Sequence, residues 1–173
     1  KSLRSHGMTS LSFERHQGRT ISYDVNEAGL NYRIDEIRSS IGLVQLSKLS
    51  EANSRRESLT NKYCTMLSKV LTVPYRNEDY LARCSPAFHI MPVLLPKEVS
   101  RNEVIEKMKS RKVQTSIHYP AFSEFNAYKN FDFSATTISE EICSREITLP
   151  LFPTMTDEQL DLVVDALNSA ITL

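Results

Sequence analysis

The sequence predicts an α+β fold, in which a small antiparallel or mixed sheet is covered by helices on one side. Apolar residues recur at three- and four-residue steps in several segments, as they do on one face of a helix. These segments are interspersed with short β-type segments that are joined in part by tight turns. The composition allows a real core, since 40% of the 173 residues are hydrophobic and 24% are charged.

Residues 1–30 have no helical or strand period. Their apolar residues are scattered among polar and charged ones, a pattern that is typical of a loop. Because long structureless loops are uncommon in compact domains, we expect this arm to serve a site or to have lost the part of the protein on which it packs. The chain also begins on a lysine, so we expect it to be a piece of a longer protein.

Two helices are expected after this arm. The first begins at Ile34, because apolar residues then share one helical face: Ile34, Ile37, Ile41 and Val44. The second follows the N-cap Ser50, and its apolar face would hold Leu59, Tyr63, Met66 and Val70. The two could also form one bent helix, because the residues between them are weak helix breakers.

Strands and helices are then expected in turn. Residues 71–74 and 87–96 have strand character, and Pro92 would place the second strand at an edge or a bulge. A capping box of Ser100 and Glu103 begins the next helix. The remaining expected elements are a strand at 112–120, a packed loop or short helix at 121–133, a helix near 136–145, a strand at 146–151 and a helix from Thr156, boxed by Gln159.

Charge and hydropathy argue against two classes of partner. The 21 basic and 21 acidic residues cancel, whereas a dedicated nucleic-acid binder usually carries a basic surplus. No apolar run approaches the length of a membrane span. We therefore expect no nucleic-acid partner and no membrane partner.

The cysteines and histidines argue against a disulfide framework or a metal site. Cys64, Cys84 and Cys143 are odd in number, far apart and outside any C-x-x-C pair, so a reducing compartment, the cytoplasm, is expected. Cys64 is expected to pack on a helix rather than to act as a nucleophile. His89 and His118 fall on expected strands without metal-ligand spacing, so no metal site is expected.

Polar segments at the ends of elements are the best candidates for a site. They comprise residues 4–7, 29–33 and 118–120. A helix N-terminus attracts anions, and the Asn31 amide and Arg33 guanidinium just before one would strengthen the attraction for a phosphate. The alternative interpretation is that Asn31 caps the helix, Tyr32 packs and Arg33 is solvated.

Several motifs resemble one family. They are "RSHGM" from Arg4, "GLNYRIDEIRSSIGLVQLSKL" from Gly29, "RRESLTNKYCTML" from Arg55, "VQTSIHYPAFSEFNAY" from Val113 and "ITLPLFPTMTDEQLDLVVDAL" from Ile147. In this order they resemble the DegT-type sugar aminotransferases, which use pyridoxal phosphate (PLP) and have fold type I. The chain departs from the family at Ser39 and Ser40, where alanines are usual, and these hydroxyls could bond back to the preceding turn or contact the partner subunit.

The resemblance implies a domain organisation. Residues 1–33 would be the tail of the large PLP-binding domain, and residues 34–173 would be the C-terminal small domain of a fold type I PLP-dependent transferase. The lysine that forms the Schiff base with PLP would lie upstream of "RSHG", and Lys1 is too close to this segment to match it. The chain would then contain no catalytic residue and would not be active alone.

The resemblance also implies roles for site residues. In a homodimer with shared active sites, Asn31 would contact the cofactor phosphate of the partner subunit. Arg33 would support that phosphate or a phosphate of the substrate. His118 and Tyr119 would bind the substrate, a sugar or its nucleotide.

The implied activity is transfer of an amino group from glutamate to a nucleotide-linked keto-sugar. Such a reaction would serve polysaccharide, cell-surface or secondary-metabolite sugar biosynthesis. Two alternatives remain at the level of the sequence. One is a dehydratase or regulatory relative of the same fold, and the other is a non-catalytic α+β binding module.

Overall fold

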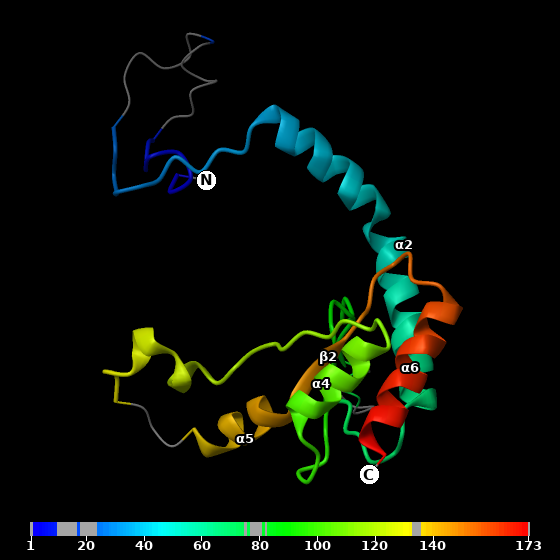
Figure 1. Ribbon diagram of the computed structural model, residues 1–173. Helices are drawn as coiled ribbons and strands as arrows, with labels where there is room; N and C mark the ends of the chain where they lie inside the picture. Colours follow the sequence, from blue (N-terminus) through cyan, green and yellow to red (C-terminus); the bar gives the residue numbers. More distant parts are fainter. Residues whose placement is uncertain are drawn as a thin grey trace. The chain divides into compact units, whose positions relative to one another are not determined.

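A computed structural model describes most of the chain (Figure 1). The described residues are 2–9, 17, 24–74, 76, 81, 83–132 and 136–172. They belong to two compact units, Lys1–Lys48 and Leu49–Leu173, and each unit is described by itself. The expected domain boundary after residue 33 concerns a longer protein and stays a prediction.

In the first unit, the segments 2–9 and 24–32 pair with each other. Antiparallel bridges join Ser5 to Asn31 and Met8 to Val25. Further backbone hydrogen bonds join the two segments, and each segment supplies donors and acceptors. One of them is donated by the Leu30 amide to the Leu3 carbonyl at 2.7 Å. The described part of the arm is therefore more regular than the loop that its scattered apolar residues predict.

The helix α2 is one continuous element, Glu36–Met66. Of the two arrangements that the sequence allowed, the single helix is the one that forms. Asp35 caps it, because its side chain accepts the Arg38 amide proton at 2.8 Å. Ser39 donates to the Asp35 carbonyl and Ser40 to the Glu36 carbonyl, both at 2.8 Å, so these hydroxyls bond back to the preceding turn as expected.

The sheet of the second unit consists of β1 (Met91–Leu94) and β2 (Glu146–Leu149). They pair antiparallel, with Met91 opposite Leu149. The expected strands at 71–74 and 112–120 are wrong in extent, since each is reduced to a single bridge on the outer side of a sheet strand. The α+β class with a small antiparallel sheet is confirmed.

Pro92 accounts for the short pairing on one side of β1. The Leu94 amide points toward Thr72 and bonds to its carbonyl at 2.8 Å. Alternation along the strand points the Pro92 nitrogen to the same side, where it has no proton to donate. The ladder with the 71–74 segment therefore cannot continue past Leu94, as the edge position expected for this proline implies.

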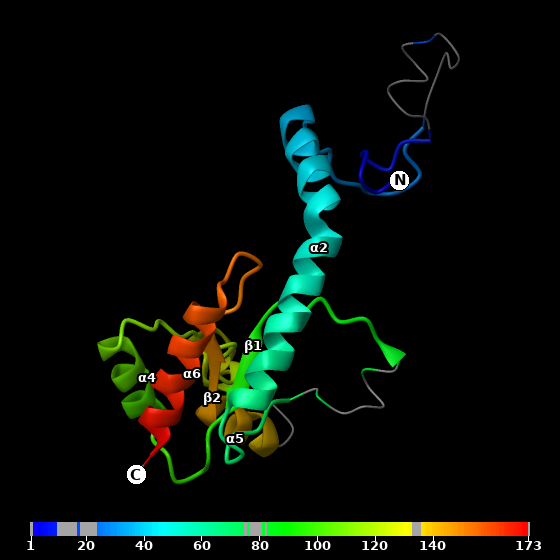
Figure 2. The same ribbon diagram turned by 90° about the vertical axis from the view of Figure 1, so that its right-hand side faces the viewer.

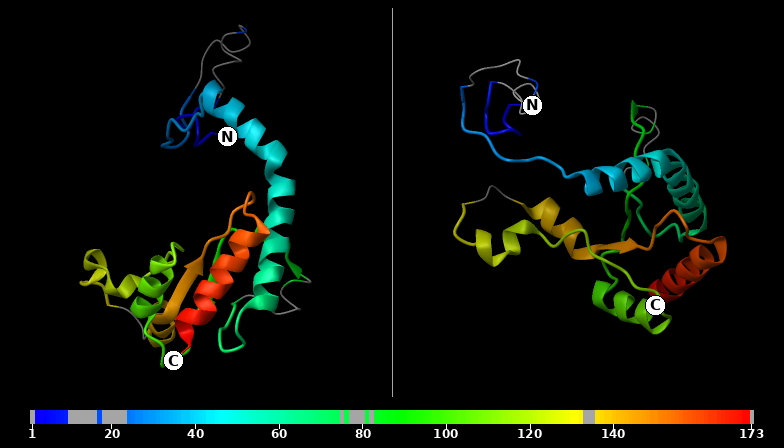
Figure 3. Two further views of the ribbon diagram at one scale, coloured as in Figure 1. Left: turned by 45° about the vertical axis from the view of Figure 1, so that its right-hand side comes forward. Right: turned by 90° about the horizontal axis from the view of Figure 1, so that it is seen from above.

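Helices cover one face of the sheet, and α4 and α6 lie next to each other in the second unit (Figures 2 and 3). The helical elements after α2 are α4 (Arg101–Ser110), η1 (Phe122–Glu124), η2 (Asn126–Tyr128), α5 (Thr137–Arg145) and α6 (Asp157–Ile171). Ser100 caps α4 by accepting the Glu103 amide proton at 3.5 Å. The capping box of Thr156 and Gln159 is complete and begins α6 as predicted.

The core lies between these helices and one face of the sheet. Its largest fully buried side chains are Leu59, Tyr63, Met91, Val93, Leu95, Val104, Met108, Ile147, Met155, Leu160 and Leu167. Because side chains alternate along a strand, Met91, Val93 and Ile147 face this core. The opposite face of the sheet carries Glu146 and Thr148, which are buried polar residues.

None of the helices in the described residues is long and apolar enough to cross a membrane.

Candidate functional site

The segment around Asn31 is held by backbone hydrogen bonds within the paired arm, that is, the two paired segments 2–9 and 24–32. The Tyr32 amide donates to the Arg4 carbonyl at 2.9 Å, and the bridge to Ser5 fixes Asn31 itself. The side chains of Asn31 and Arg33 are exposed, and Tyr32 is 74% exposed. The backbone of this segment is thus ordered by hydrogen bonds while its side chains face outward.

Two glycines allow this close pairing. A Cβ atom added to Gly29 would lie 2.3 Å from the Gly7 nitrogen, and one added to Gly7 would lie 1.9 Å from the Glu27 carbonyl oxygen. Gly7 also has a φ of +70°, which favours glycine. The glycines of "RSHG" and "GLNYR" therefore explain why these two motifs occur together.

The alternative in which Asn31 caps the helix is wrong. Asp35 takes that role, four residues further on, and Tyr32 does not pack because it is exposed. Asp35 also pairs with Arg38 at 2.8 Å, so a carboxylate already occupies the N-terminus of α2. A phosphate near this segment would therefore be held by the Asn31 and Arg33 side chains rather than by the end of the helix.

These side chains fit a phosphate group. An amide and a guanidinium both donate hydrogen bonds to phosphate oxygens, and Arg4 lies on the paired segment of the same unit. The side chains of all three are exposed and so accessible to a ligand. His6 is also exposed, and its amide donates to the Leu30 carbonyl at 3.0 Å.

His118 and Tyr119 belong to the second unit and follow the bridge of Ser116 to β2. The His118 amide donates to Glu146 Oε2 at 3.0 Å, and its ring Nδ1 lies 2.9 Å from Thr148 Oγ1. Tyr119 is 69% exposed and meets the His118 ring edge-on, with the ring centroids 5.1 Å apart. The structure therefore holds His118 firmly and leaves Tyr119 accessible.

Glu146 is a residue that sequence reasoning missed. Its side chain lies under His118, and the residue is only 4% exposed. The Thr148 hydroxyl donates to Glu146 Oε1, which joins both residues of β2 to His118. A glutamate that begins the strand-like segment "EITL" is the sequence signal that could have pointed to a buried polar role.

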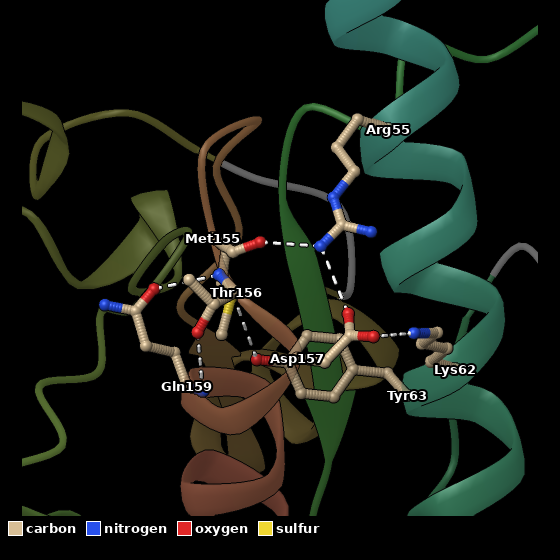
Figure 4. A network of polar contacts seen from close by, with 7 residues as sticks. All are labelled: Arg55, Lys62, Tyr63, Met155, Thr156, Asp157 and Gln159. Atoms are coloured by element: carbon tan, nitrogen blue, oxygen red, sulfur yellow. Dashed lines mark hydrogen bonds and ion pairs between the residues drawn. The ribbon is translucent and has the colours of Figure 1, made fainter.

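A second polar network fixes the segment between β2 and α6 (Figure 4). Arg55 donates to the Met155 carbonyl at 2.7 Å and pairs with Asp157 at 3.1 Å, while Lys62 also pairs with Asp157. The hydrogen bond from Lys62, followed by that from Arg55, lowers the pKa of Asp157 below its usual value. The buried Tyr63 hydroxyl donates to the Pro150 carbonyl at 2.8 Å.

The described residues contain no cluster of three or more metal-ligating side chains. Burial raises the pKa of the Cys64 thiol, while the charge of Arg76 acts in the opposite sense. A raised pKa reduces the thiolate fraction, which supports the packing role expected for Cys64.

A comparison with known protein families decides the family. The chain matches the DegT/DnrJ/EryC1/StrS aminotransferase family over residues 1–168. It belongs to this family. PLP is the cofactor of these aminotransferases, as the resemblance in the motifs implied. A relative from Methanocaldococcus jannaschii, the uncharacterized protein MJ1066, is 28% identical over 185 residues, which cover 99% of this chain and 46% of MJ1066.

Solved structures of aminotransferases share the fold. PseC from Helicobacter pylori, an aminotransferase involved in pseudoaminic acid biosynthesis, has a TM-score of 0.79 at 21% identity, over 98% of this chain and 44% of PseC. The sugar aminotransferase CalS13 from Micromonospora echinospora has a TM-score of 0.79 at 19% identity, over 97% of this chain and 43% of CalS13. Spr1654 from Streptococcus pneumoniae, in its PMP form, has a TM-score of 0.81 at 22% identity, over 98% and 43%.

The chain therefore spans less than half the length of these relatives. Spr1654 is also known in a PLP form, with a TM-score of 0.78. The matches show that the described fold is shared with a part of these aminotransferase chains. That this part is the C-terminal small domain stays a prediction, and the activity of the whole protein is a proposal.

Proposed function

We propose that the chain is the C-terminal portion of a PLP-dependent aminotransferase that converts a nucleotide-linked keto-sugar to an amino sugar. Membership of the DegT/DnrJ/EryC1/StrS family carries this proposal. Glutamate is the proposed amino donor, the cytoplasm is the proposed location, and synthesis of polysaccharide, cell-surface or secondary-metabolite sugars is the proposed setting. The lysine that binds PLP belongs, in this proposal, to the portion that precedes residue 1.

Asn31 and Arg33 bind the cofactor phosphate of the partner subunit in this proposal. Their exposed side chains, on a backbone that the paired arm holds in place, support it. PLP, when bound, supplies an electron sink for the reacting carbon. The amide of Asn31 and the guanidinium of Arg33 would orient it by donating hydrogen bonds to the phosphate oxygens.

His118 and Tyr119 bind the sugar in this proposal. The half-buried imidazole of His118 and the exposed phenol of Tyr119 lie in edge-on contact. Both groups exchange hydrogen bonds with hydroxyls, which a sugar offers in number. Neither residue is assigned a proton transfer to the reacting carbon.

The apolar face at the beginning of α2 supports a dimer. Ile37, Ile41 and Val44 are 75%, 58% and 52% exposed, although they share one face of the helix. An apolar stripe of this kind marks an interaction surface. In the proposed homodimer it is covered by the preceding domain and by the partner subunit.

The Asn31→Ala substitution in the complete protein tests the proposed cofactor contact. A lost hydrogen bond to a charged group costs roughly 1.5–3 kcal/mol, so PLP should bind about tenfold to a hundredfold more weakly. Equilibrium dialysis with absorbance detection of PLP measures the change. Asn26→Ala, another exposed asparagine of the same paired arm, is the matched control and should retain PLP normally. Equal affinity in wild type and Asn31→Ala would contradict the phosphate contact.

A further inference from the structure

The contact between Glu146 and His118 replaces a bond of the sheet. Ser116 and Thr148 exchange both backbone hydrogen bonds, at 3.0 and 2.8 Å. In a regular antiparallel ladder, the next such pair would be His118 and Glu146, through the Glu146 carbonyl. Instead, the His118 amide donates to the carboxylate of the Glu146 side chain at 3.0 Å. The Glu146 side chain thus accepts the hydrogen bond that its backbone carbonyl would otherwise accept. The pairing with β2 therefore ends at His118, the residue expected to bind substrate.

The second carboxylate oxygen organises the ring of His118. The Thr148 hydroxyl donates its proton to Glu146 Oε1. Glu146 and Thr148 are 4% and 5% exposed, so water does not compete freely for these bonds. A hydroxyl has one proton, and once this proton is given to Glu146, Thr148 Oγ1 can only accept.

This direction of bonding determines the tautomer of His118. The Nδ1 atom lies 2.9 Å from Thr148 Oγ1, which accepts and does not donate, so Nδ1 must carry the proton. A neutral imidazole carries one N–H, and Nε2 is then left with a lone pair. Among the described residues, no hydrogen bond to Nε2 is present.

We propose that Glu146 and Thr148 hold His118 as the Nδ1–H tautomer, so that Nε2 accepts a hydrogen bond from a hydroxyl group of the substrate. The last step rests on the proposed function of His118 at the sugar. An acceptor nitrogen selects a hydroxyl donor over a phosphate oxygen, which has no proton to offer in its dianionic form. Glu146 and Thr148 are therefore positioning residues, and the sugar moiety rather than the diphosphate is the group that meets His118.

The tautomer can be read without substrate and without PLP. Two-bond ¹⁵N–¹H correlation spectra of the histidine-labelled chain, recorded at alkaline pH, show which ring nitrogen carries the proton. The His118 signal is assigned by its loss in His118→Ala. We expect Nδ1–H in the wild type. An Nε2–H signal, or an average of the two tautomers, would overturn the proposal whatever the fate of the PLP-binding test of Asn31.

Substitutions give a sharper result. In Glu146→Gln, the side-chain carbonyl of the glutamine still accepts the backbone N–H of His118, and its NH2 group donates to Thr148 Oγ1. The Thr148 hydroxyl then donates its hydrogen bond to Nδ1 of His118. The ring proton of His118 should therefore move to Nε2. Glu106→Gln on α4, where Glu106 pairs with Lys109 at 3.7 Å, is the matched control and should leave the tautomer unchanged.

Two substitutions of Thr148 distinguish a role in positioning the His118 ring from a general role in the stability of the fold. Thr148→Val removes the hydroxyl and should abolish the preference for Nδ1–H, whereas Thr148→Ser keeps the hydroxyl and should restore it. A wild-type tautomer that persists in a folded Thr148→Val variant would show that the hydroxyl does not determine it, and would contradict the proposal. The wild-type spectrum decides the matter if Glu146→Gln fails to fold.

Discussion

At the scale of single residues, the paired arm depends on places where only glycine fits. The atoms that a Cβ on Gly29 would meet are all backbone, namely the Gly7 nitrogen at 2.3 Å, the His6 carbonyl carbon at 2.6 Å and the Leu3 oxygen at 2.9 Å. Backbone cannot rotate away as a long side chain can. The position of Asn31 therefore depends on two glycines, Gly7 and Gly29, which lie far apart in the sequence and which no local helix or strand signal reveals.

Gly29→Ala should separate the two paired segments. The clash pushes residues 24–32 away from residues 2–9, so the Tyr32 amide should lose its bond to the Arg4 carbonyl and exchange faster with solvent. Hydrogen exchange resolved by residue measures this loss. The control is Gly42→Ala in α2, where an added Cβ has open space and should stabilise the helix by about 0.5–1 kcal/mol. Unchanged Tyr32 protection in Gly29→Ala would contradict the account of the arm.

The site residues show where sequence reasoning reached its limit. The motif match suggested Asn31, Arg33, His118 and Tyr119, and the structure gives each an accessible or half-buried setting. Glu146 could not be found in this way, because its importance comes from the segment that ends beside it in space. A pattern along the chain does not report which strand lies next to which.

At the scale of elements, the helices were easier to predict than the strands. The helical periods and the caps at Ser100 and Thr156 are local signals, and both caps form. A strand needs a partner that is not local, and Pro92 and the Glu146 side chain each interrupt one ladder. The segments at 71–74 and 112–120 therefore remain single bridges despite their strand-like sequence.

The network at the start of α6 should make stability depend on acid pH. Its Asp157 carboxylate has a lowered pKa in the folded chain because Lys62 and then Arg55 bond to it. The stabilisation is present above the unfolded pKa of about 3.9 and is lost as the pH falls through the lower folded pKa.

Asp157→Asn measures this contribution. At pH 7 the variant should be less stable than the wild type in urea unfolding, and the difference should shrink as the pH falls below about 4. The partners are partly exposed, so added salt should also reduce the difference. A difference that stays constant from pH 7 to acid would show that Asp157 acts by packing and not by charge.

At the scale of the whole molecule, the helix α2 has a buried later part and an exposed earlier part. Its later part is anchored in the core of the second unit by Leu59 and Tyr63, which are fully buried. Its earlier part leaves Ile37, Ile41 and Val44 exposed. A sequence period predicts which residues share a face, but it does not say whether the same chain covers that face.

The central claim is that Asn31 completes the cofactor site of the partner subunit. It is tested most directly by mixed dimers of the complete protein. One subunit carries Asn31→Ala, and the other has its PLP-binding lysine replaced by alanine. If Asn31 acts across the interface, the subunit that keeps the lysine receives an intact Asn31 from its partner.

The measurement is the amount of PLP that survives dialysis, per dimer, in the purified mixed species. We expect one tightly held PLP per mixed dimer, whereas dimers with Asn31→Ala in both subunits should lose PLP about tenfold to a hundredfold more readily. If the mixed dimer instead releases PLP as readily as the double Asn31→Ala dimer, then Asn31 does not act across the interface, and the central claim is contradicted.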